Sequence, residues 1–550
     1  MANVYWNPDG ADHNWDTAAS WAHEDGGTAD ATTPTASEDV FFTGTNVNNC
    51  TIAVNAVAKS ITATGYTGTI TTSGNFKLTL SGNITTTGTL IIGGGTATNR
   101  LFICSDTMGT PRTITANALT AVNIDFRDIT SANAVNLSAI AGGSGNCGGN
   151  TGITFTAADD WYWFKDTGSF SSTVLWFTQT GGAGTRIDSD ARNAKVILPQ
   201  DTCYFDSGSF SAGSKTVTQD MPRIGSVIWT GATNTPTFTT STTASCFGSI
   251  TLIAGMTLTT SAQAYTFEGR GSYTLDSGSQ TWAKSIILNA PGGSGILTLK
   301  NNLTLVTTRT LTVTAGTLTC VDGANNWVIS TGILSVNDSN TAILTLGSAT
   351  HLITGAVTAW TFGANAVLSA NTSTIKFTGV LTENFNFSGG GKTTYNNIWN
   401  ATTGAYIMIV GNTNTFADFK IDAGREVNFI NSTNTTVTTF TALGTSGSHI
   451  VIHNTSGTTH ATLTKAGGGV ISGCDYIDIQ EMTGSPATTW YIGANSTDTG
   501  TTCTNIILEN TPAGVSGPAN LKTLNTNLAA NIKTYNTNPL ANIKSINTNV

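Results

Sequence analysis

The sequence predicts an all-β protein built from two tandem β-solenoid modules of the parallel β-helix type, each with a tryptophan-rich head. Composition, short turn-bounded strands and an internal duplication support this fold class. Charged residues make up only 10% of the 550 residues, and 60 residues are glycine. A chain poor in Glu, Lys and Arg and rich in β-branched residues favours strands and turns over helices. Its hydrophobic content of 39% is below the globular average but too high for disorder.

The duplication is clearest in the two heads. Each head has a Tyr-Trp pair, a further tryptophan and a double glycine that begins five residues after that tryptophan. These residues are Tyr5-Trp6, Trp21 and Gly26-Gly27 in the first copy, and Tyr162-Trp163, Trp176 and Gly181-Gly182 in the second. A unit that is repeated and lengthened is typical of an extended, modular, structural chain.

Each head is followed by a stretch rich in Thr, Gly and Asn that closes on a similar strand. The closing strands are residues 124–130, with sequence IDFRDIT, and residues 477–483, with sequence IDIQEMT. These boundaries predict a first module over 1–157 and a longer second module over 158–510. Residues 511–550 then form a linker and three 11-residue repeats.

The bodies of the modules consist of short strands separated by Gly or Asn turns. In Leu297-Thr298-Leu299 and Leu303-Thr304-Leu305 the leucines share one face of the strand and the threonine takes the other. Strands this short are stable only when successive coils stack on one another. Leucine inward and threonine outward therefore predicts a narrow core with a threonine-lined exterior. A string of β-sandwich domains is the alternative.

The C-terminal repeats begin at Asn520, Asn531 and Asn542, which gives a period of 11. Their apolar spacing of three or four residues resembles that of a right-handed coiled coil, but Asn and Thr are poor helix formers and Pro539 interrupts the seam. We favour an extended docking or assembly peptide, with a coiled coil and a disordered segment as alternatives. The candidate assembly and anchoring residues are Leu521, Leu524, Ile532, Tyr535, Ile543 and Ile546.

Pairs of carboxylates are candidate catalytic groups because many β-helices are polysaccharide lyases or hydrolases. Asp125 and Asp128 have opposite strand parity, as do Asp475 and Asp478, so neither pair faces one surface. A glycosidase needs two carboxyl groups on one surface about 5 to 10 Å apart. Stacking of coils could still bring distant acids together. We predict no catalytic residues and assign most aspartates to turns and caps.

The histidines and cysteines do not form a metal-binding pattern. His449 and His453 share a strand face but lie about 13 Å apart, and His460 follows beyond a glycine turn. The eight cysteines have irregular spacing and no CxxC pair, which does not fit a zinc site. We expect them to be small buried hydrophobes. We predict no metal site and no cofactor.

The charge pattern and the absence of targeting signals argue against nucleic-acid-binding, conventionally secreted and membrane-spanning proteins. The net charge is −9 with no basic run, so a nucleic-acid interface is not expected. The first residues resemble no signal peptide, and no apolar run of about 18 residues occurs. We expect synthesis in a cytosol, no membrane insertion and release by a route other than ordinary secretion.

The aromatic cluster of the second head has two interpretations. Trp161, Trp163 and Trp176 lie close together in the sequence. The favoured interpretation is a capping core that shields the end of the solenoid. In the alternative, the three rings are exposed and stack on sugars or partner proteins.

The heads, the closing segment 475–500 and the Asn-Ile-Lys-Thr tail together resemble modules in structural proteins of tailed bacteriophages. The resemblance implies a non-enzymatic component of the virion surface: a fibre, a tail protein or a capsid decoration. It implies a homo-oligomer, often a trimer, made in the host cytoplasm and attached to other virion proteins through the C-terminal repeats. A host-surface glycan is a further candidate partner. The alternatives are a bacterial surface adhesin, a tailspike-like polysaccharide depolymerase and an architectural filament subunit.

Overall fold

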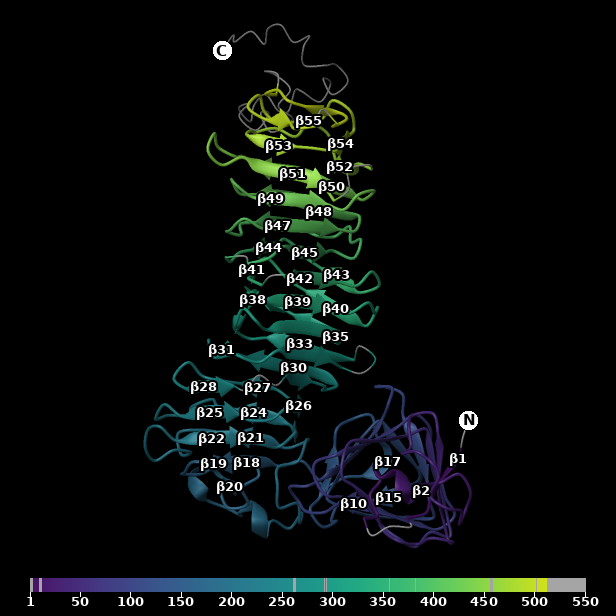
Figure 1. Ribbon diagram of the computed structural model, residues 1–550. Coiled ribbons are helices and arrows are strands. Elements are labelled where there is room, and N and C mark those ends of the chain that lie inside the picture. The colour runs from purple at the N-terminus through teal and green to yellow at the C-terminus, as the bar shows by residue number, and fades with distance from the viewer. Residues whose placement is uncertain are drawn as a thin grey trace, which may run out of the picture. The chain divides into compact units, whose positions relative to one another are not determined.

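The computed structural model describes residues 3–8, 12–260, 264–290, 292, 294–355, 357–380, 382–455, 459–500 and 502–511. The predicted fold class is confirmed: the chain is all-β, with 2% helix, and its strands form a parallel β-solenoid (Figure 1). It divides into two compact units, residues 1–327 with 341–343, and residues 328–340 with the chain from Leu344.

The first 157 residues coil through three sheets whose strands pair in parallel, apart from one antiparallel pair in the head. One complete coil consists of β6 (Ser60–Thr64), β7 (Ile70–Thr72) and β8 (Lys77–Leu80), one strand in each sheet. The other strands of the first sheet are β1 (Asn3–Trp6), β2 (Trp21–Ala22), β3 (Asp39–Thr43), β9 (Ile84–Thr86), β12 (Arg112–Thr115), β15 (Ile129–Asn136) and β17 (Thr151–Thr154). The second adds β4 (Cys50–Ile52), β10 (Thr89–Gly94) and β13 (Ala118–Val122), and the third adds β5 (Ala56–Ala58), β11 (Leu101–Ser105), β14 (Ile124–Arg127) and β16 (Ser144–Asn146).

The core of this module is a set of apolar columns that run from coil to coil. Val40, Ile61, Ile84 and Ile114 occupy matching register positions in β3, β6, β9 and β12, and all four are buried. The residues on either side of each point outward because successive side chains alternate across a strand. Alternation alone predicted which residues lie inside.

The rest of the first unit repeats this design with new sheets that begin at β18 (Asp160–Trp163). One core column contains Ile224, Cys246, Phe267, Leu288 and Val313. Their strands are β23 (Arg223–Ile224), β26 (Ala244–Cys246), β29 (Tyr265–Phe267), β32 (Ile286–Asn289) and β35 (Thr310–Thr319). Cys246 sits in the column as one of its apolar members. Seven of the eight cysteines are free and buried, as expected, and Cys503 is half-buried.

In the second unit the coils become simpler. The coil of β41 (Thr350–Ile353), β42 (Val357–Phe362) and β43 (Val367–Ser369) has three strands, whereas the coils over residues 374–479 use two, and the coil after them again has a third strand, β55 (Trp490–Tyr491). One sheet then contains β44 (Thr374–Phe377), β46 (Asn397–Asn400), β48 (Asn414–Ile421), β50 (Asn434–Ala442), β52 (Ala461–Lys465) and β54 (Met482–Ser485). The other contains β45 (Phe385–Ser388), β47 (Ile407–Gly411), β49 (Glu426–Phe429), β51 (Ile450–Asn454), β53 (Ile477–Ile479) and β56 (Thr497–Asp498).

The two heads are aromatic plugs of the same construction. In each, a Tyr-Trp strand pairs antiparallel with a second tryptophan, and the two indoles meet edge to face, 5.1 Å apart in the first head and 4.9 Å in the second. Trp161, Trp163 and Trp176 are each 0% exposed. The alternative in which these rings stack on a sugar or a partner is therefore wrong, because the plug leaves no ring face accessible. They cap the core instead.

The closing strands of the two modules also match in conformation. The prediction of one continuous strand in each segment is wrong, because residues 124–130 divide at Asp128 into β14 and β15, and residues 477–483 divide at residues 480–481 into β53 and β54. In each segment, the residue before the first strand and the residue before the next strand adopt positive φ, so the chain turns sharply at both corners. The values are 45° at Asn123 and 57° at Asp128 in the first module, and 52° at Tyr476 and 55° at Glu481 in the second. The duplication seen in the sequence is thus also a duplication of backbone geometry.

The C-terminal repeats fall outside the described residues, which end at residue 511. The assembly and anchoring assignment therefore stays a prediction for Leu521, Leu524, Ile532, Tyr535, Ile543 and Ile546.

Candidate functional site

The most unusual polar feature of the first unit lies on the outer face of β14. Ile124 and Phe126 point into the core of the first module, while Asp125 and Arg127 point outward, yet all four side chains are buried. Asp125 and Arg127 are covered by the coils that begin the second module. We call the charged residues of this contact the seam. They are Arg100, Asp125, Arg127, Asp128, Arg223, Glu268 and Arg270.

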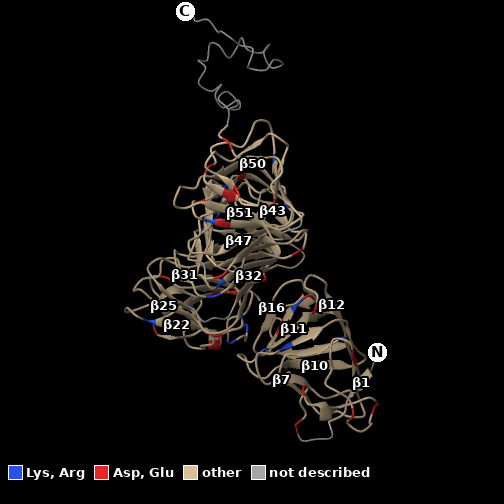
Figure 2. Cartoon of the chain, turned by 45° about the horizontal axis from the view of Figure 1, so that its top comes forward, with Lys and Arg blue, Asp and Glu red and all other residues tan. Residues whose placement is uncertain are grey.

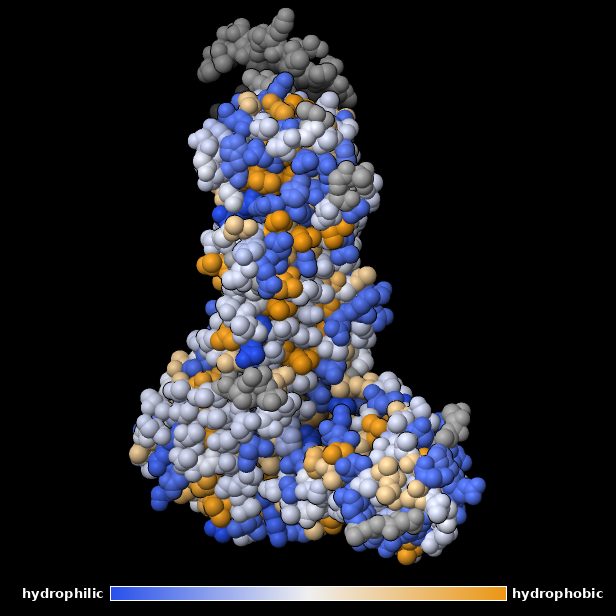
Figure 3. Space-filling model, viewed as in Figure 1, coloured by the Kyte–Doolittle hydropathy of each residue, from blue (hydrophilic) through white to orange (hydrophobic). Residues whose placement is uncertain are grey.

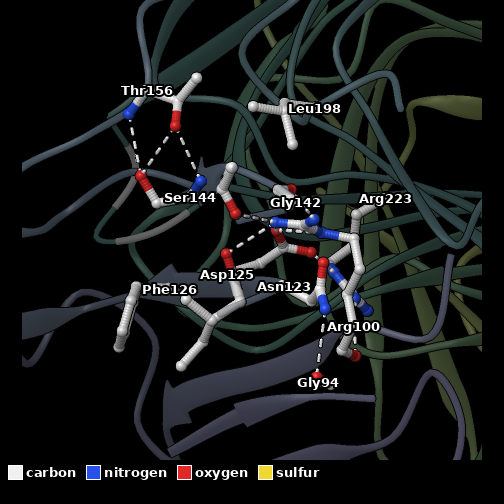
Figure 4. A network of polar contacts seen from close by, with 12 residues as sticks. Gly94, Arg100, Asn123, Asp125, Phe126, Gly142, Ser144, Thr156, Leu198 and Arg223 are labelled. Carbon is white, nitrogen blue, oxygen red and sulfur yellow. Dashed lines mark hydrogen bonds and ion pairs between the residues drawn. The ribbon is translucent and has the colours of Figure 1, made fainter. Parts of the chain in front are cut away.

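Asp125 is the centre of the seam and is held by two arginines (Figure 4). Arg100 Nε donates to one carboxylate oxygen at 2.8 Å and Arg223 Nε donates to the other at 2.7 Å. Asp125 and Arg100 are each 1% exposed. Arg100 also donates to the carbonyls of Ile124, Gly142 and Gly143, so its buried guanidinium is bonded on several sides. A buried ion pair is tolerable only when its remaining donors are satisfied in this way.

The electrostatics of Asp125 follow from these contacts. Burial alone would raise the pKa of its carboxyl group because removal from water disfavours the charged form. The guanidinium groups of Arg100 and Arg223 outweigh burial and hold the pKa of Asp125 below its ordinary value. Asp125 is thus a permanent anion that fixes two cations, and it has no proton to offer a substrate at neutral pH.

Two further ion pairs extend the seam. Arg127 Nη1 donates to Glu268 Oε2 at 2.8 Å, and Arg270 donates to Asp128. The ring of Phe102 lies under two of the cations, with centroid distances of 5.4 Å to Arg127 and 4.9 Å to Arg223. The seam therefore joins the two modules by charge and by an aromatic contact at the same place.

A cavity of about 210 Å³ lies beside the seam. Its lining includes Gln200, Phe247, Arg270 and residues 146–148. Three hydrogen bonds hold Gln200 in this lining: its amide nitrogen donates to the carbonyls of Ser144 and Thr156, and its amide oxygen accepts from Asn146 N–H at 2.9 Å. Cys147 is the one thiol in this lining, and burial raises its pKa well above the ordinary value, so it is held as an unreactive thiol.

The seam has a counterpart in the second unit. By strand register, Arg100 and Asp125 correspond to His449 and Asp478. His449 Nδ1 lies 3.0 Å from Asp478 Oδ1, and each side chain is 31% exposed. The same local pairing is therefore buried under a module in the first copy and open at the surface in the second.

Stacking also brings two distant acids onto one outer face. Glu426 and Asp478 both align with Val451, one rung to either side, so their backbones are roughly 10 Å apart. The two acids have separate partners: His453 Nε2 is 2.6 Å from Glu426, and His449 binds Asp478. Parity arguments within one strand could not reveal this column. Among the described residues no group of three or more His, Cys, Asp and Glu side chains is placed to hold a metal ion.

A column on the other sheet of the second unit was missed by the sequence analysis. Lys376, Trp399 and Lys420 occupy matching outward positions in β44, β46 and β48. The ammonium groups lie 3.6 Å and 3.8 Å from the centroid of the indole ring. The residues are more than 20 positions apart in sequence, so only the coil length brings them together. The one signal in the sequence is that Trp399 takes an outward strand position, whereas most other aromatic residues of the chain are buried.

Other groups with perturbed pKa lie inside the solenoid. Burial lowers the pKa of Lys284 to about 8, and its ammonium donates to the carbonyl of Thr242 at 2.8 Å. Burial also lowers the pKa of His351 to about 4. Its ring accepts from Ile329 N–H and contacts the carbonyl of Leu346, both at 3.1 Å. Perturbed groups indicate catalysis when they line a cleft, whereas these two serve the packing of the core.

The surface offers little that is strongly charged or broadly apolar. Lys, Arg, Asp and Glu are sparse along the chain in both units (Figure 2), and apolar residues on the visible face are scattered among hydrophilic ones (Figure 3). No helix in the part of the chain that the structure describes is long and apolar enough to span a membrane. Comparison of the chain with protein-family models, curated proteins and solved structures finds no match.

Proposed function

We propose that the chain is a non-enzymatic structural protein of a tailed-phage virion and forms a surface projection. The observation that carries the proposal is the seam. Four arginines and three acids are used to lock one β-solenoid module onto the next. In a chain with so few charged residues, placing seven of them at one junction is useful only if the two modules must keep a fixed orientation. A load-carrying or distance-setting role requires such rigidity.

The resemblance of the heads, closing strands and tail to phage structural proteins gives the proposal its biological setting. The buried aromatic plugs support it further, because they seal the ends of modules that would otherwise expose apolar core. In this function the C-terminal repeats attach the chain to other virion proteins, and the outer strand faces are available to a host surface.

Attachment can be tested with purified protein and native particles. The full chain and a form truncated after Pro512 are mixed with particles that lack the protein and then sedimented. We expect the full chain to sediment with the particles and the truncated form to stay in solution. Equal sedimentation of both forms would contradict an anchor in the repeats, and failure of both would contradict a virion location.

A polysaccharide depolymerase is a second candidate because of one observation. Glu426 and Asp478 lie on one outer face with backbones roughly 10 Å apart, from which two carboxyl groups could reach the separation of about 6.5 to 9.5 Å that inverting glycosidases use. Each acid is already engaged by a histidine, which favours the structural function. Incubation with capsular polysaccharide should leave its viscosity unchanged. A loss of viscosity that the substitution Glu426→Gln abolishes would establish the enzyme instead.

A further inference from the structure

The outward column of Lys376, Trp399 and Lys420 has the features of a ligand-binding surface. Ten of the twelve tryptophans are buried, and Trp399 is one of the two that remain half-exposed. From residue 344 to residue 511 the sequence contains only five basic residues, and two of them contact this one ring. A partly exposed tryptophan and two lysines, both scarce in this part of the chain, therefore lie together on one outward face.

The two lysines are not equivalent. Lys420 lies 3.9 Å from Asp422, which also accepts a hydrogen bond from the indole N–H of Trp399 at 2.8 Å. Lys376 forms no ion pair with any residue that the structure describes, and its neighbour on the same face is Thr374. One ammonium group is thus neutralised and orients the ring, while the other is available to an anion.

The adjacent column supplies groups suited to sugar hydroxyls. Thr374, Asn397, Asp418 and Thr439 align across four neighbouring strands. Asp418 Oδ1 accepts from the hydroxyl groups of Thr439 at 2.7 Å and Thr441 at 3.0 Å. A polar face of short side chains with one free cation and an aromatic edge fits a flat, hydroxyl-rich and negatively charged ligand.

We propose that this column binds a carboxylated glycan, with the sugar carboxylate on Lys376 and hydroxyl groups on Asp418 and Asn397. Phosphate and sulfate esters would also bind the ammonium group of Lys376, but two acids share this outer face: Asp422 lies beside Lys420, and Asp418 is aligned with Asn397. A ligand with one negative charge and neutral hydroxyl groups fits a surface that combines an ammonium group with carboxylates better than a multiply charged ester does. The inference rests on the proposed function in one respect: a surface projection is the part of a virion that would meet such a ligand.

The test is binding of two carboxylated probes to the full chain by isothermal titration calorimetry at low ionic strength. The probes are oligogalacturonate, which carries uronic acids, and oligosialic acid. Methyl-esterified oligogalacturonate is the matched neutral probe. We expect at least one acidic probe to bind, the ester to bind at least tenfold more weakly, and added salt to weaken binding because the contact is ionic. The acidic probe that binds identifies the source of the carboxylate.

The variant Lys376→Met keeps most of the stem on the indole ring and removes the charge. We expect it to lower the affinity at least tenfold without changing the thermal melting temperature. Lys300→Met is the control, because Lys300 is a half-exposed lysine directly after β33 (Gly295–Leu299) in the first unit and is paired with Asp322. It should bind as the original chain does. Trp399→Phe should retain part of the affinity.

Three results would overturn the inference: neither acidic probe binds, the ester binds equally well, or Lys376→Met binds like the original chain. These outcomes are separable from the virion proposal. A chain that sediments with particles but ignores both probes defeats only the glycan site. A chain that binds a probe through Lys376 but never associates with particles defeats only the virion location.

Discussion

At the scale of single residues, the ion pair that matters most for stability is a buried one. Asp125 accepts from Arg100 and Arg223 inside the first unit, and each of its two oxygens has its own guanidinium. Removing one partner from such a network strands the others in a low-dielectric site, and this costs far more than losing an exposed pair.

The substitution Asp125→Asn should therefore be severe. It leaves two buried arginines without their shared anion, and we expect a loss of about 3–5 kcal/mol from the free energy of unfolding of the first unit. Asp322→Asn removes the partner of Lys300 in a half-exposed pair and should cost at most about 1 kcal/mol. Chemical denaturation followed by hydrogen exchange of residues 100–270 measures both, and equal costs would contradict the central place of Asp125.

The acid stability of the seam follows from the same residue. The pKa of Asp125 is below its unfolded value, so its stabilising contribution is complete above an unfolded pKa of about 3.9 and is lost as pH falls through the folded pKa. Hydrogen exchange at the seam should stay slow at pH 5 and accelerate well below pH 4. Acceleration already at pH 5 would contradict the lowered pKa.

His351 gives the second unit a pH dependence in another window. Its pKa falls from 6.5 to about 4 on folding, so the unfolded chain binds the proton more tightly. The stability is fully present above pH 6.5 and declines as pH falls toward 4, by on the order of 3 kcal/mol. Denaturation curves at pH 7 and pH 4.5 should show this loss of unfolding free energy in the original chain and a smaller loss in His351→Gln. The control His23→Gln should lose as much as the original chain.

At the scale of elements, strand parity predicted the interior well. The Leu-Thr-Leu units place leucine inside, and the paired heads form matching plugs, because alternation across a strand is a local property. Register between coils is not local. Coil lengths vary through the chain, so the sequence analysis could not align Lys376 with Trp399, or Glu426 with Asp478. It placed Asp125 on a strand but gave it no partner, because nothing local to β14 indicates that another module covers its outer face.

The plugs provide a test at this scale. Trp176 is 0% exposed and packs edge to face on Trp163 and Phe170, so Trp176→Ala should cost about 3–5 kcal/mol. The substitution Trp399→Ala removes a half-exposed ring from an outer face and should cost about 1 kcal/mol or less. Thermal denaturation compares the two, and similar losses would contradict the capping function of the head.

At the scale of the whole molecule, the duplication explains how the chain is organised. Each copy begins with a plug, continues as stacked coils and ends on the same closing strand with two positive-φ corners. In the first copy the pair Arg100–Asp125 is covered by the next module, and in the second the pair His449–Asp478 is open. Such a design suits a structural component built by repeating a module, which is the basis of the virion proposal.

Cryo-electron microscopy of native particles that carry this chain tests that proposal most directly. The account predicts density for the β-solenoid on the outside of the particle, joined to it through residues 520–550, and no such density on particles made with the chain truncated after Pro512. Particles that carry no solenoid density, or that carry it unchanged after truncation, would contradict the account.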